Sequence, residues 1–184
     1  MYIQEFYSNM NTIDTSVFRF TTVFQGTYII VTPEFISEVL HAPRVNHPDY
    51  PSHHRLSSVS RDEMASFFYE KTMVWGETLN FSTTEFAKGP WILNMVMTFA
   101  LTPLSHYNTI TKPCARFLLS ITEDLSIDFP SHMIESMIDF CRDTTTHDKL
   151  IFTLAITRIL SYVHITISLS SPFYVMGSIS KEFI

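Results

Sequence analysis

The chain has 184 residues, of which 46% are hydrophobic and 16% charged, and its formal net charge is −6. This apolar content is enough to build a core and excludes intrinsic disorder, and the acidic balance argues against a basic protein that coats nucleic acid. The four glycines lie too far apart for a glycine-rich phosphate-binding loop.

The first elements along the chain are a hairpin and a short helix. Residues 17–31 form two β-branched and aromatic runs on either side of Gln25 and Gly26, which predicts a β-hairpin. Thr32 is a good helix cap and Pro33 suits the first turn of a helix, so a helix is expected from there to about residue 40.

The middle of the chain reads as a loop followed by helices. Residues 41–59 hold three prolines and show no hydrophobic period, which predicts a loop. Ser60 with Glu63 matches a capping box and starts a second helix. Proline and capping signals predict further helices over residues 91–101, 113–125 and 131–142, and from Thr145 or Asp148 to 163.

Two of these helices have informative faces. The segment 131–142 is amphipathic, with one apolar stripe made by Met133, Ile134, Met137, Ile138 and Cys141. The last helix has polar residues at every fourth position, namely Lys149, Thr153, Thr157 and Ser161. Such a narrow polar seam places this helix at the centre of the core.

The sequence therefore predicts a mainly α fold, an irregular bundle of five or six helices with a short N-terminal β-hairpin. A single domain is expected over residues 1–167, and residues 168–184 form a tail or the start of a truncated segment. The N-terminus lacks the basic residues of a signal peptide, so an intracellular location is expected. Residues 150–169 are apolar, but Arg158 near their centre disfavours a membrane span and favours a core helix.

Catalytic and metal-binding patterns are weak in this sequence. No Gly-x-Ser-x-Gly, His-Glu-x-x-His or Cys-x-x-Cys motif is present, and the two cysteines are read as small buried hydrophobes. His47, Asp49 and His53, in a loop that also contains His41 and His54, are a candidate zinc set, but their spacing matches no familiar site. We therefore expect a solvated loop there, with no catalytic residue, metal or cofactor.

The charges are distributed unevenly. Residues 123–148 contain seven acidic side chains, with Arg142 as the only arginine or lysine before Lys149, and would repel nucleic acid. The stretch 41–61 carries Arg44, Arg55 and Arg61 against the single acid Asp49. If the protein contacts a phosphate backbone, these three arginines are the candidate contacts.

The order of these motifs resembles a known family. Residues 91–121 read WILNMVMTFALTPLSHYNTITKPCARFLLSI, a tryptophan-led helix that runs into a Leu-Pro-x-Ser-His type corner. This is similar to the "Putative plant transposon protein" domain of retroelement-derived plant reading frames, over about residues 5–167. The positions that carry the likeness are Gly26, Pro33, Trp91, Pro103, Ser105, His106 and Arg116.

The resemblance implies an origin in a mobile element and no particular reaction. The chain departs from the family in having Gln25 where an arginine is common, and only Lys88 near the tryptophan helix. Both changes remove positive charge. We therefore expect a non-enzymatic structural or interaction domain, which associates with itself or with another retroelement protein and does not enter a membrane. The alternative is a nucleic-acid-binding module that uses the 41–61 loop.

Overall fold

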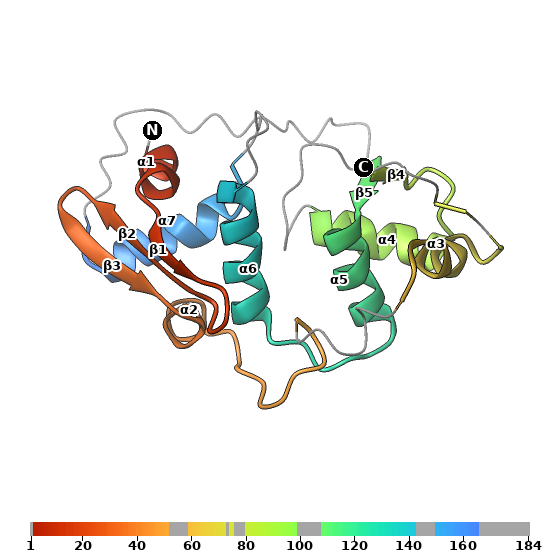
Figure 1. The fold of residues 1–184 in the computed structure, drawn as a ribbon, viewed down its shortest axis with the longest axis horizontal. Coiled ribbons are helices and arrows are strands. Elements are labelled where there is room, and N and C mark those ends of the chain that lie inside the picture. Colours follow the sequence, from red (N-terminus) through yellow and green to blue (C-terminus); the bar gives the residue numbers. More distant parts are fainter. Residues whose placement is uncertain are drawn as a thin grey trace, which may run out of the picture.

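The computed structural model describes residues 2–51, 59–72, 74–75, 80–98, 108–142 and 150–165. Within these ranges the chain forms seven helices and five strands, arranged in two groups (Figure 1). In chain order they are α1 (Tyr2–Ser8), β1 (Asn11–Asp14), β2 (Arg19–Phe24), β3 (Thr27–Val31), α2 (Pro33–Leu40), α3 (Arg61–Tyr69), β4 (Asn80–Ser82), α4 (Lys88–Val96), β5 (Thr109–Thr111), α5 (Lys112–Thr122), α6 (Phe129–Arg142) and α7 (Thr153–Tyr162).

The predicted hairpin is confirmed as strands β2 and β3, which pair in regular antiparallel register from Phe24 with Thr27 to Phe20 with Val31. Gln25 and Gly26 both have positive φ, 46° and 79°, as a two-residue type I′ turn requires. Strand β1 adds to the other side of β2 in an irregular register, so the hairpin belongs to a three-stranded sheet.

Two helix starts follow the sequence signals closely. The side-chain oxygen of Thr32 accepts a hydrogen bond from the backbone N–H of Phe35 and caps α2. At α3, the hydroxyl of Ser60 accepts from the N–H of Glu63, and the Glu63 carboxylate accepts from the N–H of Ser60. This reciprocal pair is the predicted capping box.

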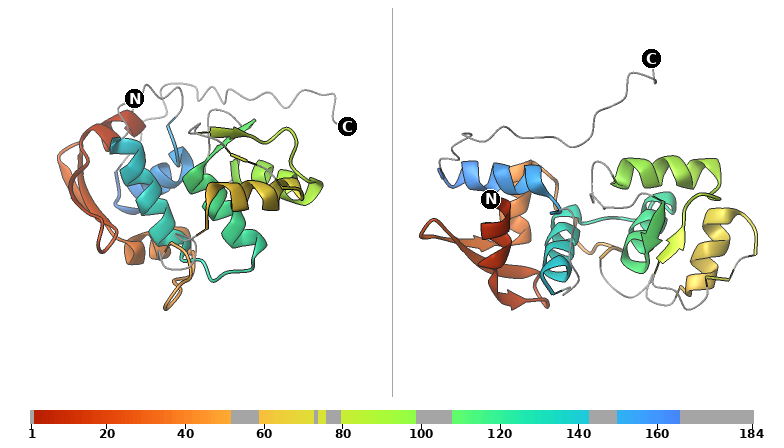
Figure 2. Two further views of the ribbon diagram at one scale, coloured as in Figure 1. Left: turned by 45° about the vertical axis from the view of Figure 1, so that its right-hand side comes forward. Right: turned by 90° about the horizontal axis from the view of Figure 1, so that it is seen from above.

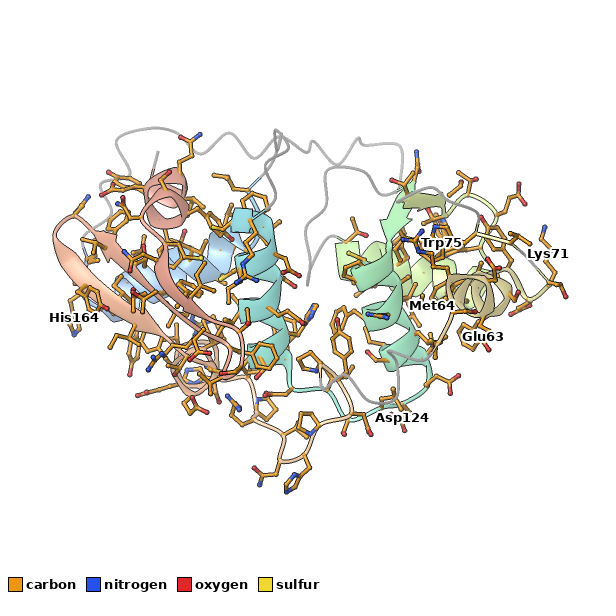
Figure 3. The ribbon with its side chains drawn as sticks, viewed as in Figure 1. Glu63, Met64, Lys71, Trp75, Asp124 and His164 are labelled. Carbon is orange, nitrogen blue, oxygen red and sulfur yellow. The ribbon has the colours of Figure 1, made fainter. Side chains whose placement is uncertain are left out.

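The first hydrophobic core joins the two ends of the chain. Helices α1, α2, α6 and α7 pack with the sheet, and Phe6, Phe20, Ile36 and Met137 are fully buried in it. The Tyr7 hydroxyl donates to the carbonyl of Ile151, which ties α1 to the segment before α7. The three orientations in Figures 1 to 3 all keep these elements in one group.

The second core is built from the middle of the chain. Helices α3, α4 and α5 and the β4–β5 ribbon surround Met64, Phe68, Met97, Ile110 and Leu118. Phe129, at the start of α6, packs against both cores and marks the junction between them. The right-hand view of Figure 2 shows α6 and α5 as the helices that face the junction.

Several sequence expectations need correction. The described residues contain seven helices, not five or six, because the seven-residue α1 is held by its buried Ile3, Phe6 and Tyr7 rather than by a long periodic pattern. The two-stranded ribbon β4–β5 was not expected, since three-residue strands leave almost no alternation to detect. The expectation of a single domain over residues 1–167 stays a prediction.

Helix limits also differ from the predicted ones. Helix α4 begins at Lys88, three residues early, and the predicted residues 99–101 lie outside the described part of the chain. Helix α5 ends at Thr122, because Asp124 adopts a left-handed φ of 51° and the Leu125 N–H bonds back to Ser120.

The last helix was predicted to be the centre of the core, and this is wrong. Helix α7 buries Ile156, Ile159 and Leu160 on one face, but Leu154 is 83% exposed on the other. It covers the first core from outside, as the right-hand view of Figure 2 shows. The predicted stripe of α6 is confirmed, since four of its five residues are fully buried and Cys141 is half-buried.

Candidate functional site

One set of contacts at the junction between the two cores is made by Arg44, which lies in the predicted loop. The Arg44 guanidinium lies 3.0 Å from the Glu34 carboxylate on α2 and 3.2 Å from the carboxylate of Asp128, which precedes α6. Asp128 is almost fully buried, and one of its oxygens also accepts from the Ser131 hydroxyl at 2.6 Å. Since a buried carboxylate needs a partner, Arg44 serves first as a counter-ion inside the protein.

The same loop pairs with the chain segment that enters α6. The Asp49 N–H donates to the carbonyl of Ser126 at 2.9 Å, and the Ser126 N–H and hydroxyl donate to the Asp49 carboxylate at 3.1 and 2.8 Å. One residue on, Tyr50 and Ile127 form a parallel bridge. The Asp128 N–H then donates to the Tyr50 carbonyl at 2.9 Å. These contacts hold two segments that are far apart in sequence side by side.

An aromatic stack fills the junction beside these paired segments. The His132 imidazole on α6 lies on the Phe117 ring of α5, with centroids 4.1 Å apart and 20° between the planes. The Tyr50 hydroxyl lies 3.2 Å from His132 Nδ1. His132 Nε2 is buried and has no hydrogen-bond partner within the described ranges. Burial lowers the pKa of His132 to about 3, so the ring is neutral at neutral pH.

Charged groups continue this junction on the facing helices α5 and α6. The pKa of Glu135 is raised to about 7, mainly by burial and also by the nearby Asp139, while Arg116 opposes the shift. The pKa of Asp139 is also raised by burial, against the effect of Arg142. Burial raises the pKa of Tyr50 well beyond its usual value, and Glu135 adds to this shift. At neutral pH Glu135 is therefore partly protonated, whereas an exposed glutamate would be ionised.

Sequence reasoning did not find this cluster. Tyr50, Phe117, His132 and Glu135 come from three separate segments, and no spacing along the chain connects them. The one available signal was Arg116, named for its family likeness, whose Nε atom is buried without a partner in the described part of the chain. Chemically, the cluster can shift stability with pH and hold the two cores together.

The candidate nucleic-acid contacts are only partly visible. Arg44 is engaged by two carboxylates, as described above. Arg61 begins α3, and its guanidinium lies 5.9 Å from the centroid of the Trp75 ring, a cation–π distance. Trp75 lies beyond the end of α3 (Figure 3). Its backbone N–H donates to the Asp62 carboxylate at 2.7 Å. Arg55 lies outside the described residues.

The candidate metal set is not assembled in what the structure describes. His41 and His47 are exposed on the loop and Asp49 is engaged with Ser126, while His53 and His54 lie outside the described residues. Across the described ranges no three His, Cys, Asp or Glu side chains are grouped so that they could hold a metal ion. In the same ranges, no helix combines the length and the hydrophobicity needed to cross a membrane.

The family-like positions have structural roles where they are described. Gly26 supplies the positive φ of the hairpin turn, and Pro33 is the first residue of α2. Trp91 is on α4 and is 44% exposed. Pro103, Ser105 and His106 lie outside the described residues.

Comparison with protein-family models identifies the family of this chain. The family model described as "Putative plant retrotransposon-related domain" matches residues 1–166, which confirms the resemblance seen in the sequence. No curated protein and no solved structure matches the chain. The described fold, with its N-terminal hairpin, its tryptophan-led helix and the helices that follow, is thus the fold of a family domain that covers nearly the whole sequence. The chain belongs to the plant retrotransposon-related domain family.

Proposed function

We propose that this domain is a non-enzymatic structural and interaction module of a retroelement protein, and that it acts by associating with further copies of the same chain. The observation that carries the proposal is the exposed apolar face of α4. Trp91, Ile92 and Val96 are 44%, 45% and 54% exposed, although bulky apolar side chains are usually buried.

These side chains form one continuous surface. Because successive helical residues are about 100° apart, Trp91, Ile92 and Val96 fall within about 140° of the helix circumference. Gly89 lies next to Val96 on this projection, and a Cβ built there would meet no atom within 4 Å. A second helix can therefore approach this end of the face closely.

A second copy is the partner that suits this face best. Positions 91, 92 and 96 carry no charge, and the exposed Lys88, which falls within the same arc, is the single charged residue of α4, so the face is mainly apolar. Two copies related by a two-fold axis would place the same apolar patch against itself, which is the usual geometry of a homodimer. The contact is small for a permanent interface, so we expect association that depends on concentration.

The test is the molar mass by light scattering across a concentration series, for the wild-type chain and for the triple variant Trp91→Ser/Ile92→Ser/Val96→Ser. We expect the wild-type mass to rise toward a defined oligomer and the triple variant to stay monomeric. Leu154→Ser is the matched control, because it removes an exposed apolar side chain on α7 and should leave association unchanged. A wild-type monomer at all concentrations, or equal association of the triple variant, contradicts the proposal.

The non-enzymatic part of the proposal is supported by what the junction groups already do. Arg44, Asp128 and Asp49 each bind other groups of the protein, and the His132 ring is stacked and buried. These contacts join the two cores, and each of them has a purely structural reason.

Nucleic-acid binding through the 41–61 loop is the second candidate. It would need Arg44, but that side chain is held by Glu34 and Asp128. The candidate predicts an affinity for duplex DNA that falls with salt, by about 0.9 in log K per phosphate contact for each tenfold rise in salt. Binding that survives Arg44→Ala/Arg55→Ala/Arg61→Ala without loss would rule this loop out.

A further inference from the structure

The two edges of the three-stranded sheet differ. At the β1 edge the register shifts between Asn11 and Asp14, and Thr12 has a φ of 46°. Such a kink, together with a charged side chain, keeps another strand from pairing there. The β3 edge, Thr27–Val31, is uncharged and pairs with β2 in unbroken register. Within the described part of the chain no strand pairs with its other side, which Figure 1 shows at the outer end of the sheet.

The backbone groups on this edge follow from the register of the hairpin. Residues of an antiparallel pair alternate between those that bond to the neighbouring strand and those that point away from it. Phe24 and Thr27 flank the two-residue turn and form a bonded pair, as does every second pair along the hairpin. The N–H and C=O groups of Tyr28 and Ile30 therefore point to the outer edge of β3. The side chains of these two residues are 59% and 50% exposed.

Strand β3 is complementary to a second copy of itself. When two β3 strands run antiparallel about a two-fold axis at Ile29, Tyr28 of each copy lies opposite Ile30 of the other. These residues then form bonded pairs, so each outward N–H and C=O obtains a partner. Their exposed side chains pair an aromatic ring with a β-branched residue, a favourable cross-strand combination. Neither copy brings a charge into the contact, which matters because chains with a net charge of −6 repel one another elsewhere.

The residues on either side of β3 limit the length of this contact. In the same register Gln25 of one copy lies opposite Pro33 of the other. Pro33 has no N–H to donate, and the chain leaves the sheet at the turn formed by Gln25 and Gly26. The contact is thus confined to the five residues of β3 and buries little area. We therefore expect weak association that does not raise the mean molar mass in the light-scattering experiment above.

We propose that the β3 edge is a second self-association surface, at which two copies of the chain pair antiparallel with Ile29 opposite Ile29. The contact joins two three-stranded sheets into one continuous sheet. It belongs to the first core, whereas the apolar face of α4 lies over the second core and shares no residue with it. Pairing at β3 therefore leaves the α4 face available and links α4-associated copies to one another.

Disulfide trapping tests the proposal, because it detects a minor population and depends on the register. One chain carries Tyr28→Cys and the other Ile30→Cys, both with Cys114→Ala and Cys141→Ala so that no native thiol competes. Opposed residues of a bonded pair have Cα atoms about 5.5 Å apart, within reach of a disulfide, whereas identical residues lie diagonally, about 7–8 Å apart. With oxidised glutathione as the oxidant, we expect at least about tenfold more cross-linked dimer in the mixture than in either chain alone.

A chain with Val17→Cys is the matched control for random collision, since this side chain is 55% exposed and precedes β2. It replaces the Tyr28→Cys chain in the mixture and should give only the background yield. Equal yields in the mixture, in the separate chains and in the control overturn the proposal. Cross-links that form mainly between identical residues also overturn it, because they require a different register.

Hydrogen exchange of the cross-linked dimer distinguishes a strand ladder from a chance contact. We expect the amides at positions 28 and 30 to exchange at least about tenfold more slowly in the dimer than after reduction. The amides of Ile29 and Val31, which bond to β2, are the reference for an intact sheet. Amides at positions 28 and 30 that exchange equally fast in both states overturn the proposal. Amides already protected in the reduced chain also overturn it, since another part of the same chain would then cover β3.

Trapping in the background of Trp91→Ser/Ile92→Ser/Val96→Ser separates this contact from association through α4. An unchanged yield of the β3 cross-link is expected, because the two surfaces are independent. Loss of the cross-link in this background would make β3 pairing a by-product of α4 association and would overturn its standing as a second surface. Loss of association through α4 with an intact β3 cross-link contradicts the proposed function of the α4 face alone.

Discussion

The imidazole of His132 and the ring of Phe117 are stacked 4.1 Å apart across the junction of the two cores. One ring comes from α6 and the other from α5, so this contact links the halves of the molecule directly. It also buries a group that gains a proton readily in water, and the stability of the junction therefore depends on pH.

We expect the free energy of unfolding to fall with acid because of His132. The pKa of this ring is lowered to about 3 in the folded protein, while the unfolded chain binds the proton near pH 6.5. The contribution is therefore complete above about pH 6.5 and is lost as the pH falls toward 3, at up to about 1.4 kcal/mol per pH unit. Urea unfolding of wild type and His132→Phe from pH 7 to pH 4 checks this. A variant with the wild-type pH slope would contradict it.

Glu135 should act in the opposite direction. Its pKa is raised to about 7 in the folded state, above the unfolded value of 4.5, so its contribution is present below about pH 4.5 and is lost as the pH rises through 7. We expect Glu135→Gln to gain about 1 kcal/mol over wild type between pH 5 and pH 8, a value reduced for partial exposure. Glu123→Gln, on an exposed residue after α5, is the control and should change nothing. No relative gain in Glu135→Gln would refute the assignment.

Arg44 forms ion pairs with two carboxylates, and the two pairs should contribute unequally to the free energy of unfolding. Arg44→Ala leaves Asp128 buried without its counter-ion, and we expect a loss of about 2–4 kcal/mol in the free energy of unfolding. Glu34→Ala removes a carboxylate that is 73% exposed and also bonds to the start of α2, so it should cost about 1 kcal/mol or less. Chemical denaturation of both variants measures the difference. Equal costs would show that Asp128 does not depend on Arg44.

Single substitutions in the β2–β3 turn should change the stability of the protein in opposite directions. Gly26 has a φ of 79°, and because a Cβ there meets no atom within 4 Å, Gly26→Ala should cost about 1 kcal/mol from backbone strain alone. Gln25→Asn should stabilise by about 0.5 kcal/mol, since asparagine tolerates the φ of 46° better. Thermal unfolding of both variants should move the midpoint in opposite directions. A shift of the same sign in both would contradict the type I′ assignment.

Local features were predictable because their causes are adjacent in the chain. Thr32, Ser60 and Gly26 act on residues within three positions, and the stripe of α6 repeats with the helix. The contacts that join the cores were not predictable, because Tyr50 and His132 are 82 residues apart and nothing in either neighbourhood indicates the other. The position of α7 was misjudged for a related reason. A narrow polar seam does not reveal that Leu154 faces water, since only the neighbours in space decide this.

The paired segments around Asp49 and Ser126 have a consequence for synthesis of the chain. The first core takes its N-terminal half from residues before 41 and its C-terminal half from residues after 128. Because the chain is synthesised from its N-terminus, Phe6, Phe20 and Phe24 are made before α6, and the first core cannot be completed until α6 is present. The second core can form during that interval. The middle of the protein can therefore fold first. Pairing of the Asp49 and Ser126 segments then brings the residues before 41 and those after 128 together, and the first core is completed last.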